Sequence, residues 1–271
     1  MLADPGFLAG HLRAAGADPR SVVVGQSAPV IGAGGWFGDA LADWWHEQFR
    51  AMADPGHRFS YRDVMSGNLS VPRAEFLALG GFDEALLCRE DFELGYRLVQ
   101  AGLSLRYAAD ARALHHDAST PKRNLVRARA EGRADIQIAR KHPAMFFDMK
   151  SAGMAFPATG ARVLRLLTFR APWAGQALSR TLGAALPALR VLGMRNRWLL
   201  LGGYLRAFAY HAGVATEAGS PAAYDGLAAA ARAVTPAPPV IEADLLGDLD
   251  ALRSKVETEG PQGLRLTCGG K

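Results

Sequence analysis

The stretch 63–120 decides the fold, and it reads DVMSGNLSVPRAEFLALGGFDEALLCREDFELGYRLVQAGLSLRYAADARALHHDAST. Its hydrophobic spacing and turn residues predict a strand near the beginning, a short helix over 73–79, a helix over 90–100 and a strand over 103–107. Gly102 supplies the stop signal between the second helix and the last strand. Strands that alternate with helices are typical of an α/β sheet.

The flanking segments continue this pattern on both sides. Residues 21–25, SVVVG, form a β-branched run that predicts a buried strand, and residues 39–52 carry apolar side chains at helical spacing. A basic helix is expected over 121–142, where Pro143 ends it. Several further helices are expected over 160–214.

The positive charge of the chain is concentrated in one segment. The formal net charge is +5, yet residues 149–216 contain no Asp or Glu. The basic residues of this segment are Lys150, Arg162, Arg165, Arg170, Arg180, Arg190, Arg195, Arg197 and Arg206. Such a segment suits either an anionic membrane surface or a helical bundle with a solvated arginine face. The aromatic residues do not interleave with the basic ones, so we expect no nucleic-acid partner.

The cysteine content and the N-terminus favour a cytoplasmic protein. The two cysteines, Cys88 and Cys268, are far apart and lack the spacing of a disulfide framework or a metal knuckle. Residues 1–16 contain no sustained apolar run of the kind found in signal peptides. We therefore expect a cytoplasmic location, with peripheral attachment to the inner face of the plasma membrane as an extension of it.

Four short motifs occur in a fixed order: SGNLSVPR (66–73), GGFDE (80–84), REDFELGYRL (89–98) and ALHHD (113–117). Together they resemble glycosyltransferase family 2, the inverting enzymes of the A-type glycosyltransferase fold, and the resemblance covers roughly residues 1–143. It implies an α/β fold class, with a partial, Rossmann-like A-type glycosyltransferase domain followed by an α-helical basic segment.

The resemblance assigns the catalytic base to the third motif. Asp91 matches the catalytic aspartate of the family, and Glu90 lies beside it as a contact to the acceptor hydroxyl. Inverting sugar transfer needs a base that removes the proton of the attacking hydroxyl, which a carboxylate can do. Two carboxylates at the beginning of a helix are also expected without any catalytic role, because acidic residues favour the positive end of the helix dipole.

The fourth motif resembles the C-terminal histidine of the family, which completes a metal and diphosphate site. The leaving diphosphate is highly charged, so a divalent cation, Mg²⁺ or Mn²⁺, is expected in the complete enzyme. His115 and His116 are the candidate ligands, with His115 preferred. A pair of adjacent histidines that only packs or faces solvent is the alternative.

The first two motifs are expected to contact substrate. Ser66, Gly67 and Asn68 resemble the small-residue loop below the donor sugar, where glycine permits close approach and asparagine offers a donor and an acceptor. A turn at the end of a strand is the alternative. Asp83 is expected to contact the acceptor or to hold its loop, and Arg97 to be a structural partner.

The chain divides into four predicted parts. Residues 1–148 form the acceptor-side part of a catalytic domain, 149–216 a basic amphipathic helical segment, 217–240 an Ala- and Pro-rich linker, and 241–271 the start of a further module. The family's nucleotide-binding half, with its aspartate-any-aspartate motif, would precede residue 1, so this chain is expected to be an incomplete enzyme.

These features predict transfer of a sugar, with inversion, from a nucleotide-diphosphate sugar to a polysaccharide or lipid-linked acceptor. Synthesis of a cell-envelope polysaccharide is the expected setting. The alternative is a non-catalytic module that binds the acceptor or docks on a membrane. Metal-dependent hydrolysis of the donor separates the two.

Overall fold

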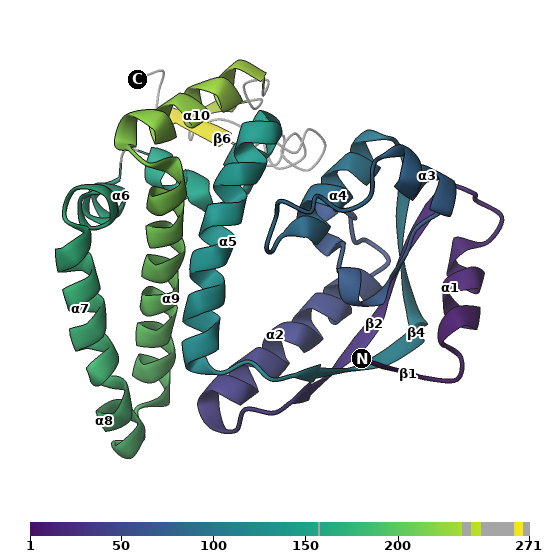
Figure 1. The fold of residues 1–271 in the computed structure, drawn as a ribbon, viewed down its shortest axis with the longest axis horizontal. Helices are drawn as coiled ribbons and strands as arrows, with labels where there is room; N and C mark the ends of the chain where they lie inside the picture. The colour runs from purple at the N-terminus through teal and green to yellow at the C-terminus, as the bar shows by residue number, and fades with distance from the viewer. Residues whose placement is uncertain (157, 235–239, 245–262, 268–271) are drawn as a thin grey trace.

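A small mixed sheet lies beside a bundle of helices in the computed structural model of the protein (Figure 1). The structure describes residues 1–156, 158–234, 240–244 and 263–267. The arrangement confirms a mixed α/β protein. No helix within these ranges has the length and apolar character needed to cross a membrane.

The sheet contains four strands in the order β1-β4-β2-β3. They are β1 (Leu2–Ala3), β2 (Ser21–Ile31), β3 (Leu69–Ser70) and β4 (Ser104–Asp117). The two long central strands, β2 and β4, are parallel, and the two short outer strands are antiparallel to their neighbours. The three strands predicted within residues 21–120 exist as β2, β3 and β4, but β4 runs on through the ALHHD motif because β2 continues to pair with it as far as Asp117.

Helices cover both faces of this sheet. They are α1 (Phe7–Ala15), α2 (Gly35–Ala53), α3 (Arg73–Ala78) and α4 (Glu90–Gln100). Successive side chains of a strand point to opposite faces. Accordingly Val22 packs against α4 and Val24 against α2, whereas Val23 packs against α1 from the other side. The β-branched run therefore fills the core on both faces, as a central strand should.

The second layer is helical (Figure 1). It contains α5 (Pro121–Lys141), α6 (Thr159–Arg165), α7 (Pro172–Ala184), α8 (Leu186–Val191), α9 (Arg195–Ala218) and α10 (Pro221–Val234), with a separate parallel pair formed by β5 (Val240–Asp244) and β6 (Gly263–Thr267). Proline occupies the first turn of α5, α7 and α8. At that position its missing N–H has no helical partner to lose.

Helices α5 and α9 approach each other so closely that glycine is required at the crossing. A Cβ on Gly132 would lie 2.0 Å from the carbonyl oxygen of Tyr210, and a Cβ on Gly213 would lie 2.0 Å from that of Arg129. Around this crossing, Ile136, which is buried, packs in the largest apolar cluster of the described residues. Side chains from before and after residue 148 contribute to this cluster. The domain boundary expected at residue 148 stays a prediction.

Residues 221–234 differ from the predicted linker, because they form α10. Tyr224, Ala228 and Ala231 follow one face of the helix and are buried. The Tyr224 ring lies 5.6 Å from that of Phe146, and its hydroxyl donates a hydrogen bond to the carbonyl of Ser151. The alanine content that indicated a linker instead permits close helix packing. Most of the further module predicted over 241–271 lies outside the described residues.

The crossing of α5 and α9 makes a prediction about glycine substitutions. Gly132→Ala should lower the free energy of unfolding by about 2 kcal/mol, because the added methyl group forces the helices apart. Gly202→Ala in α9 is the matched control, since nothing lies within 4 Å of its Cβ position. It should stabilise the helix by up to about 1 kcal/mol. Urea denaturation of both variants measures the difference, and equal effects would contradict the close contact.

Candidate functional site

The turn of the first motif and the helix start of the third motif meet in the structure. Residues Ser66–Asn68 form a short 3₁₀ turn before β3, and Asp91 lies in the first turn of α4. The backbone N–H of Phe92 donates a hydrogen bond to the Asp91 carboxylate at 2.9 Å, and the backbone N–H of Ser66 lies near enough to lower the pKa of this group. Two segments far apart in sequence therefore converge on one carboxyl group.

Asp91 occupies an environment that favours its protonated form. Burial raises the pKa of this carboxyl group, and the neighbouring Glu90 carboxylate raises it further. The two backbone hydrogen bonds and the Arg89 guanidinium act in the opposite direction. A carboxylate with a raised pKa binds a proton more strongly, which is what a general base requires.

The side chain of Asn68 fastens the turn to the sheet. It is 1% exposed. Its Nδ2 donates to the carbonyl oxygens of Gln26 and Ala111 at 3.2 and 2.9 Å, and its Oδ1 accepts from His11 Nε2 at 2.8 Å. Both groups of the amide are thus used within the protein. Ser66 and Gly67, by contrast, are exposed, and the Met1 side chain lies next to Gly67.

His11 is a buried polar residue that the sequence motifs did not single out. With its Nε2 hydrogen directed at Asn68, its Nδ1 accepts a hydrogen bond from the Ser70 hydroxyl at 2.9 Å. This chain of hydrogen bonds joins α1, the 3₁₀ turn and β3. The sequence could not identify His11 as part of this network, because its partners Asn68 and Ser70 lie 57 and 59 positions away.

Asp83 lies in a loop that is tied to the end of α5. Its carboxylate pairs with the ammonium group of Lys141 and accepts a hydrogen bond from the N–H of Ala85 at 3.1 Å. The hydrogen bond from Lys141 lowers the pKa of Asp83. These contacts hold the loop, and a contact to acceptor stays a prediction.

Arg97 is a structural partner, as predicted. Its guanidinium forms a bidentate pair with Glu93 one turn earlier on α4, at 2.6 and 2.9 Å. It also donates to the carbonyl oxygens of Leu79 and Gly81, at 2.6 and 2.7 Å. The GGFDE loop is thereby fixed against α4.

The two histidines of the fourth motif point to opposite faces of β4. His115 is half-buried and its ring centroid lies 5.1 Å from that of Trp45, whereas His116 is exposed. Burial lowers the pKa of His115, against the effect of the nearby Asp117. A lowered pKa keeps the imidazole neutral, which is the form that binds metals.

We asked whether the described residues fit a divalent cation. Within residues 1–156 and 158–234, no three His, Cys, Asp or Glu side chains come together as ligands. Next to His115, the carboxylate of Asp117 is occupied by hydrogen bonds from Trp45 Nε1 at 3.2 Å and from the N–H of Ser119 at 2.8 Å. These residues do not by themselves form a metal site.

Arg89, which precedes the two carboxylates, has an unusual backbone. Its φ of 64° is the one left-handed value of a non-glycine residue among the described residues. This conformation costs an L-residue roughly 1–2 kcal/mol. Contacts of the side chain hold it in place: the guanidinium lies over the Phe92 ring at 4.4 Å and faces Asp135 and Glu131 of α5 at 3.5 and 3.8 Å.

These charges belong to a buried group that we call the Arg89 cluster. Its members are Arg89, Glu131, Asp135, Arg206 and Tyr210. Arg206 of α9 donates to Glu131 at 2.7 Å, and the Tyr210 hydroxyl hydrogen-bonds to Asp135. Burial raises the pKa of Asp135, and the Arg89 guanidinium opposes this. The cluster joins the start of α4 to α5 and α9.

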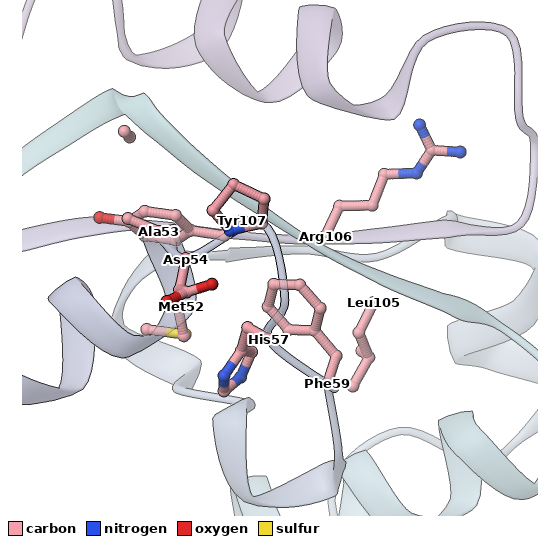
Figure 2. A pocket seen from close by; sticks show the side chains of 10 residues that line it. Met52, Ala53, Asp54, His57, Phe59, Leu105, Arg106 and Tyr107 are labelled. Carbon is pink, nitrogen blue, oxygen red and sulfur yellow. The ribbon is translucent and has the colours of Figure 1, made fainter. Parts of the chain in front are cut away.

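The surface cavity that the structure forms near α2 lies away from these residues (Figure 2). It has a volume of about 400 Å³ and is lined by Met52, Ala53, Asp54, Pro55, His57, Phe59, Leu105, Arg106, Tyr107 and Ala109. His57 is paired with Asp63 at 3.1 Å, and the guanidinium of Arg106 extends away from the hollow. None of the predicted site residues lines it.

Cys88, in the loop before α4, has no role at the site. Burial raises the pKa of its thiol to about 11. The reactive form of cysteine is the thiolate, which is scarce at neutral pH with such a pKa.

Comparison with known proteins found one partial likeness. The chain is 38% identical over 64 residues to a Bacillus subtilis (strain 168) protein named Uncharacterized glycosyltransferase YfnE. The match covers 23% of this chain and 16% of that protein. No family model and no solved structure matches.

The Arg89 cluster makes a stability prediction. Arg89→Met should lower the free energy of unfolding by about 3 kcal/mol, because it leaves the Asp135 carboxylate buried without its guanidinium partner. Arg13→Met is the control, since Arg13 forms an exposed pair with Asp110 and should change stability by less than about 1 kcal/mol. Guanidinium chloride denaturation compares the two variants. Equal losses would show that the buried pairing contributes nothing specific.

Proposed function

We propose that the protein is a glycosyltransferase in which Asp91 is the general base. The observation that carries this proposal is the setting of the Asp91 carboxylate. The N–H of Phe92 holds it, the N–H of Ser66 lies nearby, and burial raises its pKa. The partial likeness to a glycosyltransferase supports sugar transfer in general. The motif order adds family 2 as the specific expectation.

In the proposed reaction Asp91 removes the proton from an acceptor hydroxyl. The freed oxygen forms a bond to the anomeric carbon while the bond from that carbon to the nucleoside diphosphate breaks on the opposite side. The configuration inverts, the diphosphate leaves with the bonding electron pair, and Asp91 retains the proton until solvent removes it. The Phe92 N–H orients the carboxylate for this step.

The donor is a nucleotide-diphosphate sugar and the acceptor a polysaccharide or a lipid-linked glycan. Exposed backbone at Ser66 and Gly67 is the surface we assign to substrate, because glycine adds no side chain of its own there. A divalent cation with His115 as one ligand remains a prediction of the family resemblance. We derive no step through it, because the residues described do not complete a ligand set.

Asp91→Asn should lower sugar transfer by at least about 100-fold in the full-length protein, because the amide keeps the shape of the side chain and cannot take a proton. Release of nucleoside diphosphate from uridine and guanosine diphosphate sugars measures this. Asp110→Asn, on the exposed surface of β4, is the matched control and should keep full activity. Circular dichroism checks that both variants fold. Unchanged turnover in Asp91→Asn would remove this residue from the mechanism, and no release by the parent protein would favour the acceptor-binding alternative.

The environment of Asp91 also predicts a pH profile. The base acts only when deprotonated, so activity should rise with pH through a midpoint above the ordinary aspartate value of about 3.9. Because the Glu90 carboxylate raises the pKa of Asp91, Glu90→Gln should move this midpoint to lower pH. Initial rates across a pH series locate the midpoint. A midpoint that Glu90→Gln leaves in place would contradict the coupling.

A further inference from the structure

The helical layer contains a hairpin whose turn lies at the lower end of the layer, opposite α10 (Figure 1). Helices α7 and α9 are its two arms, and α8 lies near the turn between them. We call residues 186–197, LPALRVLGMRNR, the hairpin tip. Gly193, with a φ of 68°, allows the chain to turn there into α9.

The nine basic residues of the acid-free segment divide into two groups. Arg165 pairs with Asp225 at 2.7 Å and Arg206 with Glu131 at 2.7 Å, while Lys150 lies beside the Arg89 cluster. The other six are exposed, and none of them forms an ion pair or side-chain hydrogen bond with a described residue. These six are Arg162, Arg170, Arg180, Arg190, Arg195 and Arg197. Their charge is available to a partner.

Large apolar side chains are exposed in the same segment. They are Phe156, Val163, Leu166, Trp173, Leu178, Leu182, Val191, Leu192, Leu200 and Tyr204. Trp173 is 75% exposed, Val191 87% and Leu192 69%. Single exposed apolar residues are ordinary, but a concentration of them marks an interaction site.

Both features meet at the hairpin tip. Val191 and Leu192 are flanked by Arg190 on one side and by Arg195 and Arg197 on the other. The tip is held against the first turn of α2, where the Trp198 ring lies 6.1 Å from that of Trp36. It is therefore an anchored projection in which two exposed apolar residues lie between three exposed arginines in the sequence.

We propose that the hairpin tip and the adjoining faces of α7 and α9 dock on a membrane surface that contains anionic lipids. Val191 and Leu192 enter the boundary between headgroups and acyl chains, and the arginines bind lipid phosphates. Arginine suits this position because its stem can lie along apolar surface while its guanidinium reaches phosphate. The proposal does not depend on the transferase activity.

A lipid surface fits the combination of features better than other partners do. A nucleic acid would match the arginines and leave Val191 and Leu192 in water, because aliphatic side chains offer no stacking platform for bases. A second copy of this face would cover the apolar residues and bring like charges together. Anionic lipid satisfies both the charge and the apolar surface.

Co-sedimentation of the full-length protein with vesicles tests the proposal. It should bind vesicles of phosphatidylglycerol and phosphatidylcholine and bind pure phosphatidylcholine weakly. The triple variant Arg190→Gln, Arg195→Gln, Arg197→Gln should reduce partitioning into the mixed vesicles on the order of 100-fold. Arg58→Gln, Arg73→Gln, Arg232→Gln is the matched control, because it removes the same charge elsewhere and should retain most of the binding.

The double variant Val191→Ser, Leu192→Ser separates insertion from charge attraction. It should bind the mixed vesicles more weakly and release them at lower salt than the parent, since the remaining attraction is screened. Thermal unfolding checks that each variant folds. Equal vesicle binding by the two triple variants would overturn the proposal. The proposal would also be overturned if the parent bound a short DNA duplex and no vesicles, and the Arg190, Arg195, Arg197 triple variant lost that DNA binding. A third contrary result is a dimer in lipid-free buffer that the double variant dissociates while its vesicle binding is unchanged.

Discussion

The sheet and the helical layer depend on one buried interaction, the pairing of Arg89 with Asp135 and Glu131. A guanidinium that is largely removed from water needs anionic partners, and α5 provides both. The same two carboxylates bind Arg206 and Tyr210 of α9. Because α5 and α9 are also locked together by their glycine crossing, the beginning of α4 is fixed relative to the whole bundle.

The contacts of Arg89 also fix the position of the candidate base, Asp91, because the two residues are close along the backbone. Arg89 adopts a left-handed conformation immediately before the helix, and Asp91 follows two residues later. Strain of this kind persists where surrounding contacts determine it, and it is common beside functional groups. A second constraint comes from the side of the sheet, since Asn68 fastens the 3₁₀ turn that brings the Ser66 N–H near the carboxylate. The carboxylate is thus oriented from both layers.

The sequence predicts the local elements of this arrangement well and its long-range contacts poorly. Helix α4 begins and ends where its acidic first turn and Gly102 predict, and Arg97 pairs locally with Glu93. By contrast, Arg89 finds partners more than 40 residues away, which no spacing rule can reveal. Helix α10 was not predicted for a related reason. Its alanines indicate a packed helix only when the contact between Phe146 and Tyr224, which are far apart in sequence, is known.

The charge pattern is a second example of long-range contacts that the sequence does not reveal. Nine basic residues lie between 149 and 216, but their spacing does not show which of them pair with acidic residues elsewhere in the chain. The fold pairs Arg165 and Arg206 internally and leaves six arginines at the surface, three of them around Val191 and Leu192. Since Arg195 and Arg197 lie in the first turn of α9, the helix that also carries Arg206 and Tyr210, one bundle both orients the candidate base and presents the charged apolar tip. A docked bundle would then fix the orientation of the Asp91 carboxylate relative to the surface on which a lipid-linked acceptor is carried.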